Sequence, residues 1–275
     1  MSTSSPISDE QVEILINDVL EQHGYDFTGY SRASLKRRLS RLYSLDKHVS
    51  FAEFRYKTIN DDVYFKHFVE GVTVNVTEMF RDPSFYRLLR EKILPSLNTY
   101  PFIRIWLAGC STGEEAYSMA IILKELNLLH KSLIYATDIN PTVLEKAGHG
   151  MFPLSQMKNY SENYIASGGT KDFSSYYAAS YSLAKFDSEL KAKMIFSTHN
   201  LVSDRSFNEF QLILCRNVLI YFDRPLQFQV LQLFDQSLEN LGYLALGTKE
   251  TIDFSPISKS YKRVGTDKIW RKVNA

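Results

Sequence analysis

Residues 102–113 read Phe-Ile-Arg-Ile-Trp-Leu-Ala-Gly-Cys-Ser-Thr-Gly, a short β-rich run that ends in a glycine turn. A helical stretch, residues 114–126, follows this turn, and a second strand, residues 133–136, leads to Asp138. Strand, glycine turn, helix and strand in this order begin a βαβ unit. The sequence therefore predicts an α/β fold with a parallel sheet.

The chain before this unit has the pattern of a helical region. Ser8 and Gln11 form a capping box, and Gly24 suits the end of the first helix. Apolar residues at helical spacing and capping residues predict further helices near residues 31–44, 61–70 and 82–94, and one that opens at Ser50. The last of these begins at Asp82-Pro83, where an aspartate at the N-cap and a proline at N1 are expected.

The chain after residue 138 continues the α/β pattern with one interruption. Further strands are expected at residues 194–196, 210–215 and 243–246, a helix at about 225–242 and a hairpin at 260–273. Between about residues 152 and 192, Tyr, Ser and Lys dominate and the pattern breaks. We interpret this segment as an insertion or small subdomain.

The net charge of +1, from 32 Lys and Arg against 31 Asp and Glu, argues against a protein that coats nucleic acid. The charges are unevenly distributed, however. Residues 1–30 hold six acidic residues and no Lys or Arg, whereas residues 31–58 hold eight basic and two acidic residues. Such an asymmetry requires a physical reason.

The glycine turn is the strongest indication of a ligand site. A strand that ends in small residues, followed by a helix N-terminus, lets backbone amides approach a ligand. The turn lacks the third glycine of a dinucleotide motif, and Glu114 and Glu115 would repel a phosphate, but both tolerate a cationic cofactor without phosphate. Asp138 suits ribose hydroxyls. The alternatives are a tight structural turn and a cap on the next helix, although Asn140 is better placed for the cap.

Four motifs in this sequence resemble the CheR family, the chemotaxis receptor protein-glutamate O-methyltransferases that use S-adenosylmethionine. They are Asn-Val-Thr-Glu-Met-Phe-Arg-Asp (75–82), Ala-Gly-Cys-Ser-Thr-Gly-Glu-Glu-Ala-Tyr-Ser (108–118), Ala-Thr-Asp-Ile-Asn (136–140) and Cys-Arg-Asn-Val-Leu-Ile-Tyr-Phe (215–222). The first and last are specific to this family. The resemblance implies a Rossmann-like methyltransferase domain, residues 73–275, behind a small all-helical N-terminal domain, residues 1–72. It also implies that the insertion at about 152–192 is an antiparallel β-subdomain.

The resemblance also assigns the site residues. It implies S-adenosylmethionine as the cofactor and S-adenosylhomocysteine as the product. The cofactor-binding residues it implies are Asn75, Thr77, Arg81, Gly109, Glu115, Asp138, Asn200, Leu201, Arg216 and Asn217. The residues expected where methyl donor and acceptor glutamate meet are Arg216, Asn217 and Tyr221. Which of Glu114 and Glu115 reaches the cofactor stays open.

The chemistry fits these residue types. A methyl group leaves a sulfonium in one displacement, so the enzyme mainly positions donor and acceptor. A glutamate side chain, with an unperturbed pKa of about 4.3, is already ionised at neutral pH and needs no general base. The six histidines form no metal or dyad spacing, and we expect no metal site and two free cysteines. Arg216 could hold the acceptor carboxylate with both terminal nitrogens, whereas Tyr221 is either a site residue or a half-buried aromatic.

The second predicted helix carries a basic face, whose role has three possible interpretations. Its basic residues are Arg32, Lys36, Arg37, Arg38 and Arg41. They form a solvated face, bind nucleic acid, or dock the acidic methylation region of chemoreceptor cytoplasmic helices, as the resemblance implies. The nucleic-acid reading is weak because aromatic interleaving and a basic total are missing.

Several alternatives stay open at this level. The chain could methylate a different protein, or it could bind the cofactor as an interaction module without transfer. A receptor C-terminal peptide could add a strand to the β-subdomain, as in some relatives. Residues 247–250, Gly-Thr-Lys-Glu, stand where the family often has Gly-His-Ser-Glu, and this loop is left unassigned. No apolar run reaches the length of about 18 residues that a membrane span needs, and no secretion signal is visible, so we expect a cytoplasmic protein.

Overall fold

The computed structural model describes residues 7–273, which divide into two units. Unit 1 comprises the chain up to Asn75 together with residues 220–230, and unit 2 comprises the rest. The sequence had placed a boundary after residue 72 and had assigned no later segment to the helical part. The division into units does not test this domain boundary, which stays a prediction.

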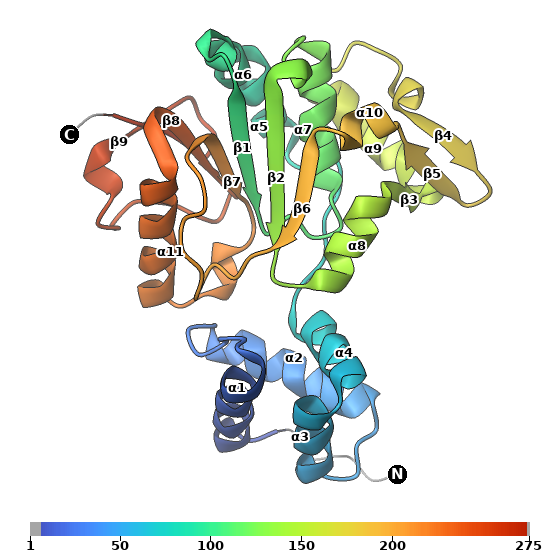
Figure 1. Cartoon of the computed structure of the whole chain (residues 1–275), viewed down its shortest axis with the longest axis vertical. Helices are drawn as coiled ribbons and strands as arrows, with labels where there is room; N and C mark the ends of the chain where they lie inside the picture. Colours follow the sequence, from blue (N-terminus) through green and yellow to red (C-terminus); the bar gives the residue numbers. More distant parts are fainter. Residues whose placement is uncertain (1–6, 274–275) are drawn as a thin grey trace. The chain divides into compact units, whose positions relative to one another are not determined.

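Unit 1 is built from helices (Figure 1), and apolar residues predicted to face the core are buried. Its helices before residue 76 are α1 (Asp9–His23), α2 (Arg32–Leu45), α3 (Phe51–Asn60) and α4 (Asp62–Val72), and its segment 220–230 holds the start of a later helix. The capping box is present, since Gln11 N donates to Ser8 Oγ at 3.2 Å and Ser8 N donates to Gln11 Oε1 at 2.9 Å. Leu35 and Leu39 of α2 are fully buried, as are Phe54 and Phe68.

The charge asymmetry of the first 58 residues has a structural reason inside unit 1. Acidic residues of α1 pair with basic residues of the two helices that follow. The pairs are Lys36–Asp9 at 2.8 Å, Arg32–Glu13 at 2.5 Å and Arg55–Asp18. The acidic first helix and the basic second helix therefore partly neutralise one another.

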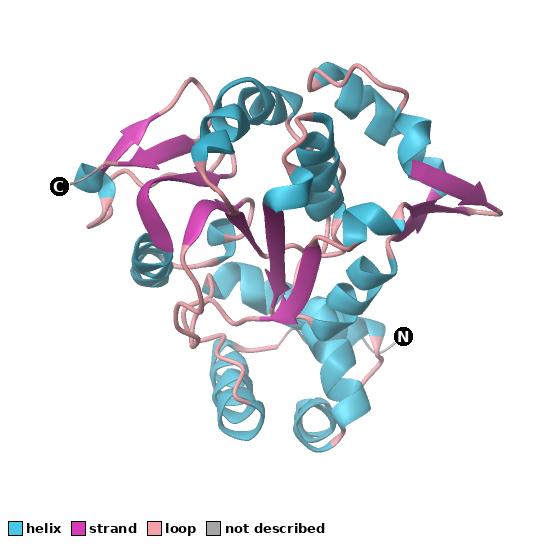
Figure 2. Ribbon diagram, turned by 45° about the horizontal axis from the view of Figure 1, so that its top comes forward, coloured by secondary structure: helices cyan, strands magenta, loops and turns pink. Residues whose placement is uncertain are grey.

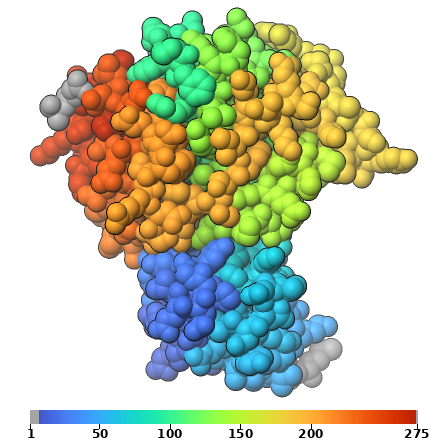
Figure 3. Space-filling view, in the orientation of Figure 1, coloured from blue at the N-terminus to red at the C-terminus, as the bar shows by residue number. Residues whose placement is uncertain are grey.

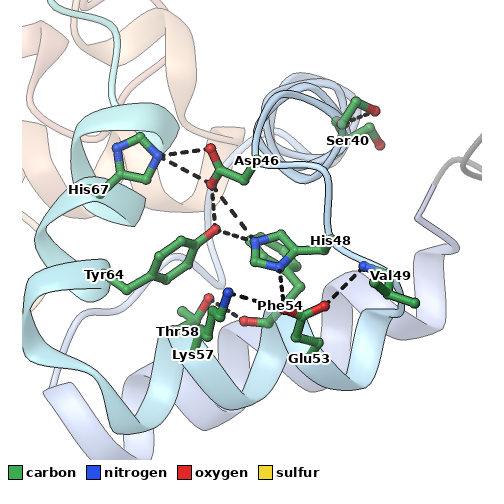
Figure 4. A network of polar contacts seen from close by, with 11 residues as sticks. Ser40, Asp46, His48, Val49, Glu53, Phe54, Lys57, Thr58, Tyr64 and His67 are labelled. Carbon is green, nitrogen blue, oxygen red and sulfur yellow. Dashed lines mark hydrogen bonds and ion pairs between the residues drawn. The ribbon is translucent and has the colours of Figure 1, made fainter.

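A polar network surrounds the buried His48, between α2 and α3 (Figure 4). The Tyr64 hydroxyl donates to Asp46 Oδ2 at 2.5 Å and lies 2.7 Å from His48 Nε2. Because the single hydroxyl hydrogen goes to Asp46, His48 Nε2 donates to the Tyr64 oxygen. His67 Nε2 lies 3.1 Å from Asp46 Oδ1. The network ties the turn after α2 to α4.

Unit 2 contains a seven-stranded sheet in the order β6-β2-β1-β7-β8-β10-β9. The first five in this order are parallel, and the last two are antiparallel to their neighbours. The strands are β1 (Ile103–Ala108), β2 (Ser132–Asp138), β6 (Met194–Thr198), β7 (Phe210–Cys215), β8 (Leu238–Leu246), β9 (Tyr261–Arg263) and β10 (Ile269–Lys272). The predicted parallel sheet and C-terminal hairpin are confirmed, and the strand order reverses between β1 and β7.

Helices cover both faces of this sheet (Figures 1 and 2). Successive side chains of a strand point to opposite faces. Ile105 and Leu107 of β1 join the apolar core that includes α7 (Glu114–Glu125), whereas Trp106 contacts Phe234 of α11 (Arg224–Ser237), with ring centroids 5.3 Å apart. The other helices of unit 2 are α5 (Pro83–Leu88), a π-helical turn (Leu89–Ile93), α6 (Leu94–Ser96), α8 (Pro141–His149), α9 (Met157–Ala166) and α10 (Ser188–Lys191).

The interruption predicted at 152–192 contains a three-stranded antiparallel sheet in the order β3-β5-β4. Its strands are β3 (Met151–Pro153), β4 (Tyr177–Ser180) and β5 (Leu183–Phe186). The hairpin between β4 and β5 projects from the surface of unit 2 in yellow (Figure 3), and Tyr181 at its turn is fully exposed. The β-subdomain is therefore confirmed.

One predicted helix end is wrong. The helix expected to run to Gly242 is α11, which ends at Ser237, and β8 begins at Leu238. Leu238 pairs with Phe210 of β7, so the parallel ladder starts where the helical pattern still continues. Tertiary pairing with a buried strand outweighs local helical propensity here.

A buried carboxylate joins the β-subdomain region to α7. Glu125 accepts hydrogen bonds from the hydroxyls of Tyr164 and Tyr176 and forms an ion pair with Arg90. Its side chain is 6% exposed. Because three separate segments converge on one desolvated charge, its loss leaves a buried cation and two hydroxyls without their acceptor.

We predict that Glu125→Ala lowers the free energy of unfolding by about 3–5 kcal/mol, as for breaking a buried ion pair. Urea unfolding followed by tryptophan fluorescence measures this, since Trp106 and Trp270 both lie in unit 2. The matched control is Glu189→Ala, whose pair with Lys124 is exposed and contributes about 1 kcal/mol or less. Equal losses in the two variants would contradict the prediction.

Candidate active site

The carboxyl ends of the central strands meet around the glycine turn. Gly109 N and Cys110 N both donate to Thr137 O, at 2.8 and 2.9 Å, which ties the end of β1 to the end of β2. Gly109 has a φ of 80°, and a Cβ at this position would lie 2.4 Å from Val218 Cγ2. Only glycine therefore fits this conformation and this approach to the segment after β7. The turn lies where the strand order reverses, which is the usual ligand crevice of such sheets.

Asp138 holds the glycine turn from the end of β2. Its carboxylate accepts from Ser111 N at 2.9 Å and from Asn140 N at 3.0 Å. Asn140 caps α8 by accepting from Thr142 N, so Asp138 is not the cap of that helix. Burial raises the pKa of the Asp138 carboxyl, although its backbone hydrogen bonds oppose the shift. A carboxylate has about four acceptor positions, so Asp138 keeps acceptor capacity for a ligand hydroxyl.

Ser111 supplies an independent indication of a ligand at this turn. Its Oγ is buried and has no hydrogen-bond partner among the described residues, and its φ is 49°. Buried polar atoms are nearly always satisfied, so this hydroxyl fits a site that a polar cofactor completes. Sequence reasoning missed Ser111. Its place between the two glycines of the turn was the available signal.

The two glutamates at the start of α7 have different surroundings. Glu114 is buried, accepts from Thr112 Oγ1 at 2.7 Å, and has its pKa raised by burial. Glu115 accepts from Arg216 Nη1 at 2.9 Å and from the Tyr86 hydroxyl at 3.4 Å. Glu115 is therefore the one that joins the other predicted site residues.

Arg216 connects three of the recognised motifs. Besides Glu115, it donates through Nη2 to Asp82 Oδ2 at 2.6 Å and to Arg81 O at 3.0 Å, and its guanidinium lies 4.1 Å from the Phe85 ring centroid. Burial alone lowers the pKa of Arg216, but the charge of Glu115 and its neighbours raises it overall. Both terminal nitrogens are occupied. A bidentate grip on an acceptor carboxylate, as the sequence suggested, would require Arg216 to exchange these partners.

The segment before α5 holds Arg81 in a strained backbone. Phe80 and Asp82, on either side of it, have φ values of 54° and 61°. Such conformations cost about 1–3 kcal/mol each and persist where the surroundings enforce them. Asp82 makes no side-chain cap on α5, contrary to the sequence expectation, because its carboxylate binds Arg216. Thr77 lies on the same half-buried segment.

Other predicted residues follow β6 and β7. His199 N donates to Asp138 O at 3.1 Å, which brings the following Asn200 and Leu201 to the end of β2. The Asn200 side chain accepts from Val202 N at 3.0 Å. Asn217 has a φ of 62° and donates its backbone N–H to Glu250.

Two predicted site residues belong to unit 1. The Asn75 amide donates to Thr73 Oγ1 at 3.2 Å. Tyr221 lies in the segment 220–230, where its carbonyl accepts from Ser31 N at 2.8 Å and its ring lies 5.0 Å from the Arg38 guanidinium. Their expected roles stay predictions.

The basic face of α2 is smaller than the sequence suggested. Arg38 is buried at 8% exposure and donates to Val72 O at 2.5 Å and to Ser34 Oγ at 3.1 Å, so its place among exposed docking residues is wrong. The apolar face of α2 extends far enough to cover the aliphatic part of the Arg38 side chain. Arg32 and Lys36 pair with α1. Within residues 7–273, Arg37 and Arg41 are exposed and have no ion-pair partner.

The sequence matches the profiles of a known family and several known proteins. The family profile "CheR methyltransferase, SAM binding domain" matches residues 75–268, and "CheR methyltransferase, all-alpha domain" matches residues 10–73. The chain is 42% identical to Cher3 of Pseudomonas putida, provisionally named a methyltransferase, over 98% of this chain and 99% of that protein. It is 32% identical to the chemotaxis protein methyltransferase of Listeria monocytogenes (83% and 85% covered) and 30% identical to that of Salmonella typhimurium (90% and 82%).

No described helix combines the length and the apolar character that crossing a membrane requires. The described His, Cys, Asp and Glu side chains form no group of three or more that could hold a metal ion.

We predict that Asp138→Asn weakens S-adenosylhomocysteine binding by about tenfold or more, because an amide N–H₂ then faces one of the two backbone N–H groups. Isothermal calorimetry measures the affinity. The matched control is Asp172→Asn. Asp172 likewise accepts a hydrogen bond from the backbone N–H two residues ahead, that of Ser174, but it lies in the β-subdomain. Because burial raises the Asp138 pKa, we also expect affinity to fall on acidification at a higher pH than for an ordinary aspartate. Unchanged affinity in Asp138→Asn would remove Asp138 from the site.

Proposed function

The chain belongs to the CheR methyltransferase family, and from this premise we propose that it methylates glutamate side chains of chemoreceptors, forming glutamate 5-O-methyl esters in sensory adaptation. It is a CheR-type methyltransferase with a domain that binds S-adenosylmethionine. Relatives named chemotaxis protein methyltransferases support the choice of acceptor. Because the methylated receptor helices are cytoplasmic, we propose that the enzyme acts in the cytoplasm.

One observation carries the proposal. The Arg216 side chain bonds simultaneously to Glu115, Asp82 and the Arg81 carbonyl, and so joins three motifs of the family at the carboxyl edge of the sheet. The three segments are far apart in the sequence. Their convergence on one buried cation supports a cofactor site at this edge of the sheet.

The described residues suit a positioning mechanism. Asp138 is proposed to bind the ribose hydroxyls, Glu115 to belong to the part of the site at the glycine turn, and Arg81 to face the carboxylate of the methionine part. When bound, S-adenosylmethionine would supply the methyl group of its sulfonium for transfer to a carboxylate oxygen, with S-adenosylhomocysteine leaving as a neutral thioether and no proton transfer. Asn217 is proposed to contact the cofactor and, together with Tyr221, to orient the acceptor glutamate. Because this carboxylate is ionised at neutral pH, no residue has to act as a general base.

We predict base-labile transfer of labelled methyl groups from S-adenosylmethionine into receptor cytoplasmic domains, since glutamate esters hydrolyse in base. The assay uses membranes that carry the cognate receptors, with Asp138→Ala as the inactive control. Base-stable label, or transfer into a protein other than a receptor, indicates a different acceptor. Tight S-adenosylhomocysteine binding without turnover on any substrate indicates a non-catalytic module. Receptors with and without their C-terminal segments are compared in the same assay.

The C-terminal segment matters because β4 offers an edge for strand addition. β4 pairs with β5, and no described strand pairs with its other edge. Residues 178–180 on this strand are exposed. We propose that a tethering peptide of the receptor adds here. The proposal requires that deleting the peptide raises KM for the receptor and leaves cofactor affinity unchanged.

Receptor docking is proposed for the exposed part of α2. Arg37 and Arg41 have their charges available for an acidic methylation region, while Arg32 and Lys36 are already paired with α1. Arg38 is instead part of the packing of unit 1. A substitution of Arg38 would therefore report on folding as much as on docking.

We predict that Arg37→Glu with Arg41→Glu raises KM for the receptor at low salt by about tenfold, with little change in kcat and a smaller effect at high salt. Initial rates at several salt concentrations measure this. The control is Lys259→Glu with Lys262→Glu, which changes the net charge equally at exposed positions of unit 2. If both double variants raise KM alike, the effect is one of net charge, and docking on α2 is refuted.

A further inference from the structure

Glu250 is a buried carboxylate in the loop after β8 that the proposed chemistry leaves unused. It is 4% exposed, although the two residues before it, Thr248 and Lys249, are exposed. A carboxylate is almost never buried without compensating hydrogen bonds. Its partners therefore indicate what it does.

Two backbone N–H groups supply that compensation. Gly247 N donates to Glu250 Oε2 at 2.6 Å, and Asn217 N donates to the same oxygen at 3.0 Å. The first bond closes the loop on itself, together with the bond from Glu250 N to Gly247 O at 3.0 Å. The second bond crosses to another segment, the one that follows β7. Bonds to an ionised acceptor are about twice as strong as neutral ones.

The conformation of Asn217 makes the second bond consequential. Its φ of 62° lies in the left-handed region, which asparagine tolerates better than most residues but does not prefer. A Cβ on Gly247 would lie 2.8 Å from Asn217 N and 3.1 Å from Asn217 Nδ2. The loop after β8 thus lies directly against both the backbone and the side-chain amide of Asn217, and a side chain at position 247 would displace it.

Glu250 also adjoins the end of β7 electrostatically. Burial raises the pKa of the Cys215 thiol, and the negative charge of Glu250 raises it further. Glu250 therefore acts on Cys215 through its charge and on Asn217 through a hydrogen bond, and these two residues flank Arg216, which bonds to Glu115 and Asp82.

We propose that Glu250 is a positioning residue of the cofactor site, which holds the Asn217 backbone in its left-handed conformation and so aims the Asn217 side chain. The inference rests on the proposed role of Asn217 at this site. Glu250 acts through Asn217 and does not itself touch the cofactor. The Gly247 backbone also holds the Glu250 carboxylate in place through its N–H, and it leaves no room for a side chain between Glu250 and Asn217.

The test measures S-adenosylhomocysteine affinity of the full chain by calorimetry, which requires no acceptor protein. We predict that Glu250→Ala weakens binding by at least about tenfold, as the loss of a charge-assisted hydrogen bond implies. Glu250→Gln, which retains one acceptor oxygen, weakens it less. Thermal unfolding of each variant is followed separately, since a purely structural role lowers Tm and leaves the affinity of the folded protein unchanged.

A double-mutant cycle tests whether the effect passes through Asn217. Asn217→Gly removes the side chain and still permits a positive φ. In that background, Glu250→Gln should cause no further loss of affinity. The matched control is Glu239→Gln, a carboxylate near the opposite end of β7 and β8 that accepts from Gln211 and Arg104, and it should leave affinity unchanged.

The outcomes are distinguishable. Additive losses in the cycle, or unchanged affinity in folded Glu250→Gln and Glu250→Ala, would overturn the inference while Asn217→Gly still weakens binding. Unchanged affinity in Asn217→Gly removes Asn217 from the site and overturns the inference with it. Failure of methyl transfer to receptors, with the affinity pattern intact, refutes only the proposed acceptor.

Discussion

The buried guanidinium of Arg216 is the interaction on which the active site of unit 2 depends. It is nearly inaccessible to solvent, and a charge in that position is tolerable only with partners of opposite sign. Glu115 and Asp82 supply them from the start of α7 and the segment before α5. The cation therefore fixes the distance between parts of the chain that no local rule brings together, and removing it would leave two carboxylates facing each other.

The same principle recurs at the carboxyl edge of the sheet, where carboxylates hold backbone amides. Asp138 binds the glycine turn through Ser111, and Glu250 binds the turn after β7 through Asn217. Each of these two turns contains a non-glycine residue with a positive φ. Backbone strain of this kind persists where hydrogen bonds over-determine the conformation. The site is thus preorganised by the protein, which suits a reaction that needs positioning more than proton transfer.

Unit 1 uses charge differently. Its acidic first helix and basic second and third helices are joined by ion pairs at the surface, which contribute little stability individually. Pairing nevertheless selects which cations stay available. Arg32 and Lys36 are paired with α1, Arg38 is buried, and Arg37 and Arg41 are exposed with no ion-pair partner among the described residues. The net charge of +1 therefore gives no indication of which charges are paired, buried or exposed.

The sequence by itself determined the α/β class, the helical N-terminal region, the β-subdomain and the family, because these depend on local periodicity, turn chemistry and motifs read along the chain. It also anticipated that Asn140, and not Asp138, caps α8. It failed at the end of α11, and it misjudged Asp82 as a cap and Arg38 as a surface cation. Only the tertiary structure decided these, and with them the partners of Glu115, Ser111 and Glu250. The physical reason is that a buried polar side chain must find a hydrogen-bond partner, and this partner is often distant in the sequence. Leaving such a group unpaired costs more free energy than a local preference, such as capping a helix, can gain.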